Sequence, residues 1–124
     1  MRKSDYPCPG CQVHKGFYDS YMHLAPQILA DLRTLHTAHP TAPILITGHS
    51  EGGAHSTFAA IDVYNTISKN VIFYSIEQPR TGNGHFAAFF TAKFPSAYRI
   101  THWKDGLIHL PPRSFGFRHI STEV

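Results

Sequence analysis

Apolar positions divide the first half of the chain into segments of different period. In residues 17–37, apolar side chains recur at steps of three and four residues, which is typical of one face of an amphipathic helix. Pro40 cannot continue such a helix. The spacing therefore predicts a helix that packs on another element and ends near His39. Its apolar face is formed by Tyr21, Ala25, Ile28, Leu32 and Leu35.

Short apolar runs without polar alternation follow this segment. Residues 43–47 and Val71–Ile76 have the pattern of strands covered on both faces. Residues 50–67, between them, have helical spacing, and a further helix is predicted over Gly84–Lys93, followed by a strand over residues 97–101. This alternation predicts an α/β fold with a mainly parallel sheet and flanking helices. The apolar side of the second helix is formed by Ala54, Phe58, Ile61 and Tyr64.

Composition and charge narrow the class of protein. A chain of 124 residues with 42% apolar and 15% charged residues is expected to form one globular domain over residues 1–124. Its 11 Lys and Arg residues are spread along the chain without a stripe of interleaved aromatics, so nucleic acid is not an expected partner. No apolar run approaches the roughly 18 residues of a membrane span, and the first ten residues contain no apolar signal core.

The chain has two cysteines, Cys8 and Cys11, in the stretch "CPGC". A zinc site needs four ligands, and a second Cys pair is lacking. A thioredoxin-like pair follows a strand and opens a helix, whereas Pro7, Pro9 and Gly10 indicate a turn. A local disulfide or two free thiols remain as the interpretations, and no metal site is expected.

The stretch "ILITGHSEGGAHS" places Ser50 between a buried strand and a helix. Gly48 and Gly52 flank it at two positions where a sharp strand-to-helix turn is expected to leave no room for a Cβ atom. This is the pattern of a nucleophile elbow, in which the amide of Glu51 supplies one donor to an oxyanion. The alternative interpretation is that the glycines only allow close packing of the helix on the strand.

Asp105 follows the last predicted strand in "THWKDGLIHLPP". A carboxylate at a strand end after the elbow fits the order Ser, Asp, His of a catalytic triad in α/β-hydrolases. Asp-Gly is also a common turn pair, so the local sequence alone leaves a structural role open.

Four stretches together resemble a known family. The stretches "VHKGFYDSY", "ILITGHSEGGA", "EQPRTGNGHFA" and "YRITHWKDGLIHLPPRSFGFRHISTEV" look like the class 3, fungal lipase-like, lipases. The resemblance implies a partial α/β-hydrolase fold and a lipase-like carboxylic ester hydrolase, with no cofactor. It assigns Ser50 as nucleophile and Asp105 as triad aspartate. His119 completes the triad order and is a weak candidate base, but the resemblance makes it structural, because the family's triad histidine lies on a later segment.

The resemblance also leads us to expect a lipase-like domain truncated at both ends. The resemblance implies lipid esters as substrates and possible contact of the protein with a lipid surface. It also implies possible secretion, since family members are often secreted. One departure is Glu51, where the family usually has Leu. Its charge, about 7 Å from a forming oxyanion, would oppose catalysis by roughly 2.4 kcal/mol at an effective dielectric of 20, and by roughly 0.6 kcal/mol in water. Glu51 therefore also suggests an alternative, a catalytically inactive lipase-like fragment that binds lipid or a partner.

Overall fold

The structure is a computed structural model that describes residues 1–103 and 105–124. Helices and strands alternate through the middle of the chain, as the apolar pattern predicts. The strand Val71–Ile76 and the helix Gly84–Lys93 have the predicted bounds. The main elements are α1 (Lys15–Ala38), β3 (Ile44–His49), α2 (Glu51–Thr66), β4 (Val71–Ile76), α3 (Gly84–Lys93), β6 (Tyr98–Ile100) and β8 (Thr122–Glu123).

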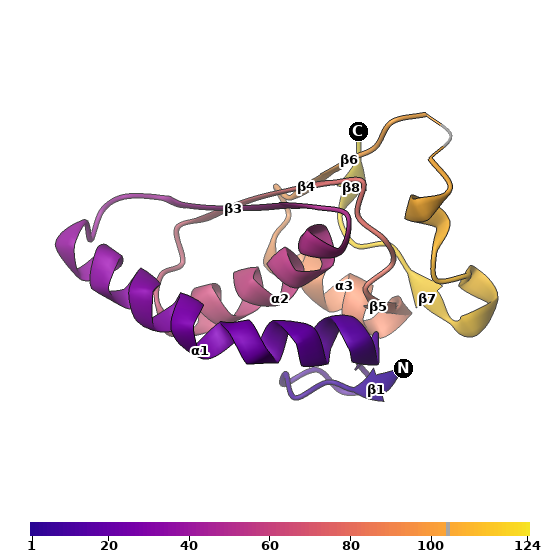
Figure 1. Cartoon of the computed structure of the whole chain (residues 1–124), viewed down its shortest axis with the longest axis horizontal. Coiled ribbons are helices and arrows are strands. Elements are labelled where there is room, and N and C mark those ends of the chain that lie inside the picture. The colour runs from indigo at the N-terminus through magenta and orange to yellow at the C-terminus, as the bar shows by residue number, and fades with distance from the viewer. Residues whose placement is uncertain (104) are drawn as a thin grey trace.

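The principal sheet has the strand order β3-β4-β6-β8, and each neighbouring pair is parallel. The three helices lie below this sheet in Figure 1, while the other face of the sheet carries no helix in that view. The predicted α/β fold with a mainly parallel sheet is therefore confirmed. A second, smaller sheet is antiparallel, with the order β1-β2-β5-β7, and its strands are β1 (Arg2–Lys3), β2 (Gln12–Val13), β5 (Gly82–Asn83) and β7 (Phe117–Arg118).

Aromatic side chains form the core between the sheet and the helices. Phe58 of α2 is fully buried, and its ring centroid lies 5.0 Å from that of Tyr18 and 5.8 Å from that of Phe86. Phe73 of β4 meets Phe90 of α3 at 5.0 Å. These contacts join all three helices and the central strand, so burial of the rings is the main term that holds the layers together.

The opposite face of the sheet corrects one sequence prediction. The runs that suggested strands covered on both faces are covered on one face only in this chain. Leu45 is 60% exposed, Ile72 40%, Ile76 41% and Ile100 42%. Apolar runs of this kind are typical of strands buried on both sides, so the sequence pattern cannot distinguish them from these strands, which the described residues cover on one face.

The long helix α1 also differs from its predicted face. Tyr18, Tyr21 and Ala25 are buried, but Ile28 is 41% exposed and Leu35 58%. The buried positions of the helix therefore lie in its first half, and Leu29 beyond them is only partly buried against the same core. No helix among the described residues is both long enough and apolar enough to cross a bilayer.

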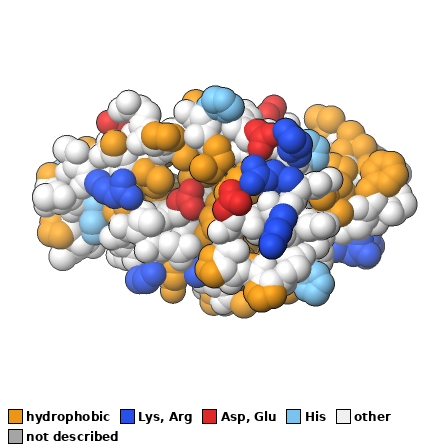
Figure 2. Space-filling model, turned by 90° about the horizontal axis from the view of Figure 1, so that it is seen from below, with side chains coloured by type: hydrophobic (Ala, Val, Ile, Leu, Met, Phe, Trp, Pro, Cys, Tyr) orange, Lys and Arg blue, Asp and Glu red, His pale blue; other side chains and the backbone are white. Residues whose placement is uncertain are grey.

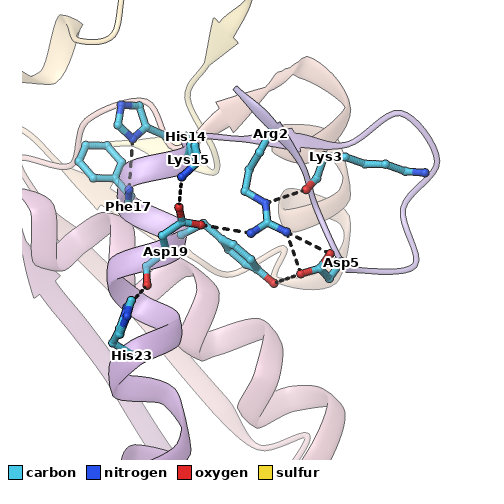
Figure 3. Close-up of polar contacts among 9 residues, drawn as sticks. Arg2, Lys3, Asp5, His14, Lys15, Phe17, Asp19 and His23 are labelled. Carbon is cyan, nitrogen blue, oxygen red and sulfur yellow. Dashed lines mark hydrogen bonds and ion pairs between the residues drawn. The ribbon is translucent and has the colours of Figure 1, made fainter.

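Polar contacts fix the first residues against α1 (Figure 3). Arg2 donates to Asp19 at 3.1 Å and to both oxygens of Asp5 at 3.1 and 3.2 Å, and Lys15 donates to Asp19 at 2.5 Å. Figure 2, which views the molecule from below, shows charged side chains of both signs among apolar ones on this face. Such exposed pairs each contribute little to stability.

The two cysteines lie in the loop that connects β1 to β2. Cys8 and Cys11 form a disulfide with their Cα atoms 5.5 Å apart. Cys11 is 1% exposed and belongs to the core, so the bridge links the loop to the packed interior.

Candidate active site

Ser50 occupies the turn between β3 and α2. The strand ends at His49, the helix begins at Glu51, and Ser50 has φ 55° and ψ −125°. This conformation is strained for a residue with a Cβ atom and costs about 1–3 kcal/mol. The Ser50 amide donates to the carbonyl of Ile76 at 2.9 Å, while its side chain makes no capping hydrogen bond. The predicted sharp turn is thus confirmed, and it leaves the hydroxyl unused by the helix.

The glycines around Ser50 are not equivalent. A Cβ atom at Gly48 would lie 2.1 Å from the carbonyl oxygen of Gly52, so only glycine fits there. A Cβ atom at Gly52 would meet nothing within 4 Å, and the prediction that both flanking glycines lack room is wrong for Gly52. Gly53 is the second close approach, because a Cβ atom there would lie 3.0 Å from Cβ of Gln78.

A buried hydrogen-bond network holds the segment after β4 against the helix that follows Ser50. Gln78, fully buried, donates through Nε2 to the hydroxyls of Thr57 at 2.9 Å and Thr81 at 2.7 Å. Thr57 in turn donates to the carbonyl of Gly53 at 3.0 Å. The segment after β4 is therefore joined to the first turns of α2, which restrains the backbone around Ser50.

The carboxyl ends of β3, β4 and β6 lie at one edge of the sheet, because the three strands are parallel. Ser50 follows β3, and Asp105 follows β6 after a short loop. Asp105 is half-buried, and its Oδ1 accepts a hydrogen bond from the Leu107 amide at 2.8 Å. The topology places both predicted residues beyond the same edge of the sheet. Lys104, which belongs to the motif around Asp105, lies outside the described residues.

Sequence reasoning missed a further carboxylate at this edge, that of Glu77. Glu77 directly follows β4, between the strands that lead to Ser50 and Asp105, and has φ 48°. Its Oε1 accepts from the His102 amide at 2.5 Å, and its Oε2 is buried without a partner among the described residues. An acidic residue immediately after a parallel strand was the signal that could have identified it.

The carboxylate of Glu51 lies in water rather than in a dry pocket. Its side chain is 60% exposed, and Nε2 of His55 lies 3.4 Å from its Oε1. The Coulomb repulsion of an oxyanion about 7 Å away is then near the lower figure, roughly 0.6 kcal/mol. The backbone amide of Glu51 is the first of the helix and has no partner one turn earlier, so it remains able to donate to an anion.

His119 lies among cations rather than beside a carboxylate. Burial, the largest cause, and the charges of Arg99 and Arg80 together lower the pKa of its imidazole to about 4, against a smaller opposing effect of Glu123. A triad base needs the opposite environment, since it must carry a positive charge in the transition state. The surroundings therefore agree with a structural role for His119. No group of three His, Cys, Asp or Glu side chains among the described residues is arranged to hold a metal ion.

A parallel sheet with a strained serine between a strand and a helix defines part of an α/β-hydrolase fold. Residues 1–115 match the family described as Lipase (class 3), and the chain belongs to that family. The lipase of Rhizopus niveus aligns with 97% of this chain at 37% sequence identity. Secreted mono- and diacylglycerol lipase 1 of Fusarium solani aligns with 92% of the chain at 40% identity.

Solved structures agree with this assignment. Lipase II from Rhizopus niveus superposes on 97% of the chain with a TM-score of 0.90 and 37% identity. A triacylglycerol lipase whose catalytic centre is formed by a serine protease triad superposes on 99% of the chain with a TM-score of 0.92 and 34% identity. The chain spans 32% and 34% of the two curated relatives and 47% and 48% of the two solved chains.

Proposed function

We propose that Ser50 is the nucleophile of a lipase-like carboxylic ester hydrolase that acts on lipid esters. The observation that carries this proposal is the strained φ and ψ of Ser50 at the turn between a parallel strand and a helix. Strain of this size persists only where the surroundings enforce it, and here Gly48 and Gln78 do so. The names of the relatives, lipase and mono- and diacylglycerol lipase, favour a hydrolase over a non-catalytic lipid-binding fragment.

The proposed reaction has two halves. The Ser50 oxygen adds to the acyl carbonyl while a histidine takes its proton, and the Glu51 amide donates to the resulting oxyanion. The histidine then gives the proton to the departing alcohol, which leaves an acyl enzyme that water cleaves to a carboxylic acid. Asp105 would orient that histidine. Secretion is part of the proposal, because relatives are named as secreted and a disulfide suits an oxidising compartment.

The test is hydrolysis of p-nitrophenyl butyrate by the purified 124-residue chain. We expect turnover to be slow, since His119, the histidine that completes the triad order, is buried among cations, and a site without a working base keeps a residual acceleration of only about 10³ to 10⁴ over water. Any turnover above that residual should be lost in Ser50→Ala, while Ser96→Ala, at an exposed serine, should not change it. His119→Ala should also have no effect. Loss of robust activity with His119→Ala would make His119 the base, and turnover above the residual that Ser50→Ala leaves unchanged would refute the proposal.

A reagent that needs no turnover separates the nucleophile from the rest of the mechanism. An alkyl phosphonate ester transfers its phosphonyl group to an activated serine and releases its leaving alcohol. Mass spectrometry of the digested protein should locate the adduct on Ser50. Labelling spread over several serines, or absent from Ser50, would count against the elbow assignment.

A further inference from the structure

A small polar cavity lies beside strand β7, and Ser50 is not among the residues that line it. It has a volume of about 270 Å³ and is lined by Arg80, Arg113, Arg118 and His119. Three guanidinium groups and an imidazole thus face one space. Among the described residues that line it, none is acidic.

The arginines are held in place by neutral partners. Nη1 of Arg80 donates to the carbonyls of His109 and Pro111, and Nη1 of Arg118 donates to those of Arg113 at 3.1 Å and Phe117 at 2.8 Å. Carbonyl oxygens satisfy some N–H groups and fix the orientation of each guanidinium. They do not neutralise its charge, so the cavity stays strongly positive.

The excess of positive charge in the cavity is clearest at Arg80. The residue is only 6% exposed, and its Nε is buried without a partner among the described residues. Burial and the nearby charges of Arg113, Arg118 and Arg99 lower the pKa of its guanidinium. A buried cation among like charges is unfavourable unless an anion accompanies it.

Glu123, whose charge raises the pKa of the cavity residue His119, is already engaged. Glu123 accepts a hydrogen bond from Arg99 through Oε2 and another from Thr101 at 3.3 Å through Oε1. Its side chain is 55% exposed, and it is not among the residues that line the cavity. His119 adds a second buried atom with open hydrogen-bonding capacity, its Nδ1.

We propose that this cavity binds one small oxyanion, a phosphate or a carboxylate group. The free Nε of Arg80 and the remaining N–H groups of Arg113 and Arg118 would donate to its oxygens, in the forked geometry that guanidinium groups offer to planar carboxylates and to phosphates. The site is independent of the proposed ester hydrolysis, because it uses neither Ser50 nor Asp105.

Thermal unfolding in different anions tests the proposal. The 124-residue chain is heated in chloride, in inorganic phosphate and in acetate, at one pH near 7 and one ionic strength. A dissociation constant of about 1 mM would raise the melting temperature by roughly 4 to 6 °C at about 10 mM anion. A larger shift in phosphate identifies a phosphate group as the ligand type, and a larger shift in acetate identifies a carboxylate. Equal melting temperatures in all three salts would overturn the proposal.

Two variants separate a site from general screening. Arg113→Gln removes a cavity charge from an exposed residue and should reduce the shift at least threefold. Arg33→Gln removes the same charge from an exposed residue of α1 and should leave the shift unchanged. Helix α1 begins near β7 and ends at the opposite side of the molecule (Figure 1). Arg33 lies in the second half of this helix. An equal loss in both variants would mean that the anion acts on net charge only.

A local probe provides a readout that does not depend on folding stability. The imidazole resonances of His119 should shift during a phosphate or acetate titration at pH 7 and saturate with the same dissociation constant as the thermal effect. Resonances of His23, on the outer surface of α1, should not move with this constant. Saturation at His23 but not at His119 would place the anion elsewhere and refute the assignment.

Discussion

Replacing Gly48 and Gly52 by alanine, one at a time, should have opposite effects on stability. A sequence pattern treats the two glycines as equal members of the elbow. In the structure, a Cβ atom at Gly48 would lie 2.1 Å from the oxygen and 2.4 Å from the carbonyl carbon of Gly52, and 2.8 Å from the nitrogen of Gly53. All three atoms belong to the backbone, so no side chain can rotate to make room.

The magnitude for Gly48→Ala follows from what must move. Ordinary contact would require α2 to withdraw from β3 by about 1 Å, at the upper end of the roughly 1–3 kcal/mol range of overpacked cores. The shift would also weaken the 2.9 Å hydrogen bond from the Gly53 amide to the Ser50 carbonyl, worth about 1 kcal/mol. We expect a loss of about 3–4 kcal/mol, a large part of the roughly 5–15 kcal/mol that stabilises a typical domain.

Gly52→Ala should instead stabilise the protein. Nothing lies within 4 Å of the added atom, and Gly52 is the second residue of α2. Alanine at an unstrained helical position restricts the unfolded chain and gains about 0.4–1 kcal/mol. Urea unfolding followed by far-UV circular dichroism measures both variants. Unfolding free energies that shift in the same direction in both variants, or that differ between them by less than about 1 kcal/mol, would refute the steric account of the elbow.

Three further outcomes follow from the geometry. Glu51→Gln should raise the rate of phosphonate labelling of Ser50 by no more than about threefold, because the exposed carboxylate acts through water; a gain near 60-fold would mean a dry site. Burial raises the pKa of the Asp62 carboxyl in the folded protein, so ionisation of this group opposes folding. The stability that the protonated carboxyl contributes is fully present below about pH 4 and is lost as the pH rises through the pKa of the folded state. Asp62→Asn should therefore reduce the loss of unfolding free energy between pH 4 and pH 7, and an unchanged loss would contradict this. Finally, the native chain should bind the dye ANS at the open sheet face, and Leu45→Lys should weaken the fluorescence; equal fluorescence in both would place the dye elsewhere.

Most strands of the principal sheet and the helices packed on it could be predicted from the sequence, because the apolar patterns that indicate them are local. The run at Val71–Ile76 and the helix Gly84–Lys93 needed only contiguous apolar residues and clear ends. The side chain of Asn83 caps that helix by accepting from the Phe86 amide at 3.0 Å. The antiparallel sheet was missed because its two-residue strands are too short to show any period.

Only the part of the candidate site that lies within the sequence motif around Ser50 could be predicted. Ser50 could be placed at a turn because the strand and the helix on either side have strong patterns. The unequal space at Gly48 and Gly52 depends on how α2 crosses β3, which no local pattern encodes. The environment of His119 depends on Arg80 and Arg99, which are distant in sequence and reach it only through the tertiary fold.

The two outer strands of the principal sheet have a consequence for how the protein must be handled. Strands β3 and β8 each have a hydrogen-bonded neighbour on one side only within the described sheet, and Leu45 of β3 is 60% exposed. Unpaired strand edges beside apolar surface are templates for further strands. Joining of two molecules at such an edge is a second-order process, so its rate rises with the square of the protein concentration. Dilution during purification will therefore limit this joining more effectively than cooling, which weakens hydrophobic contacts only modestly.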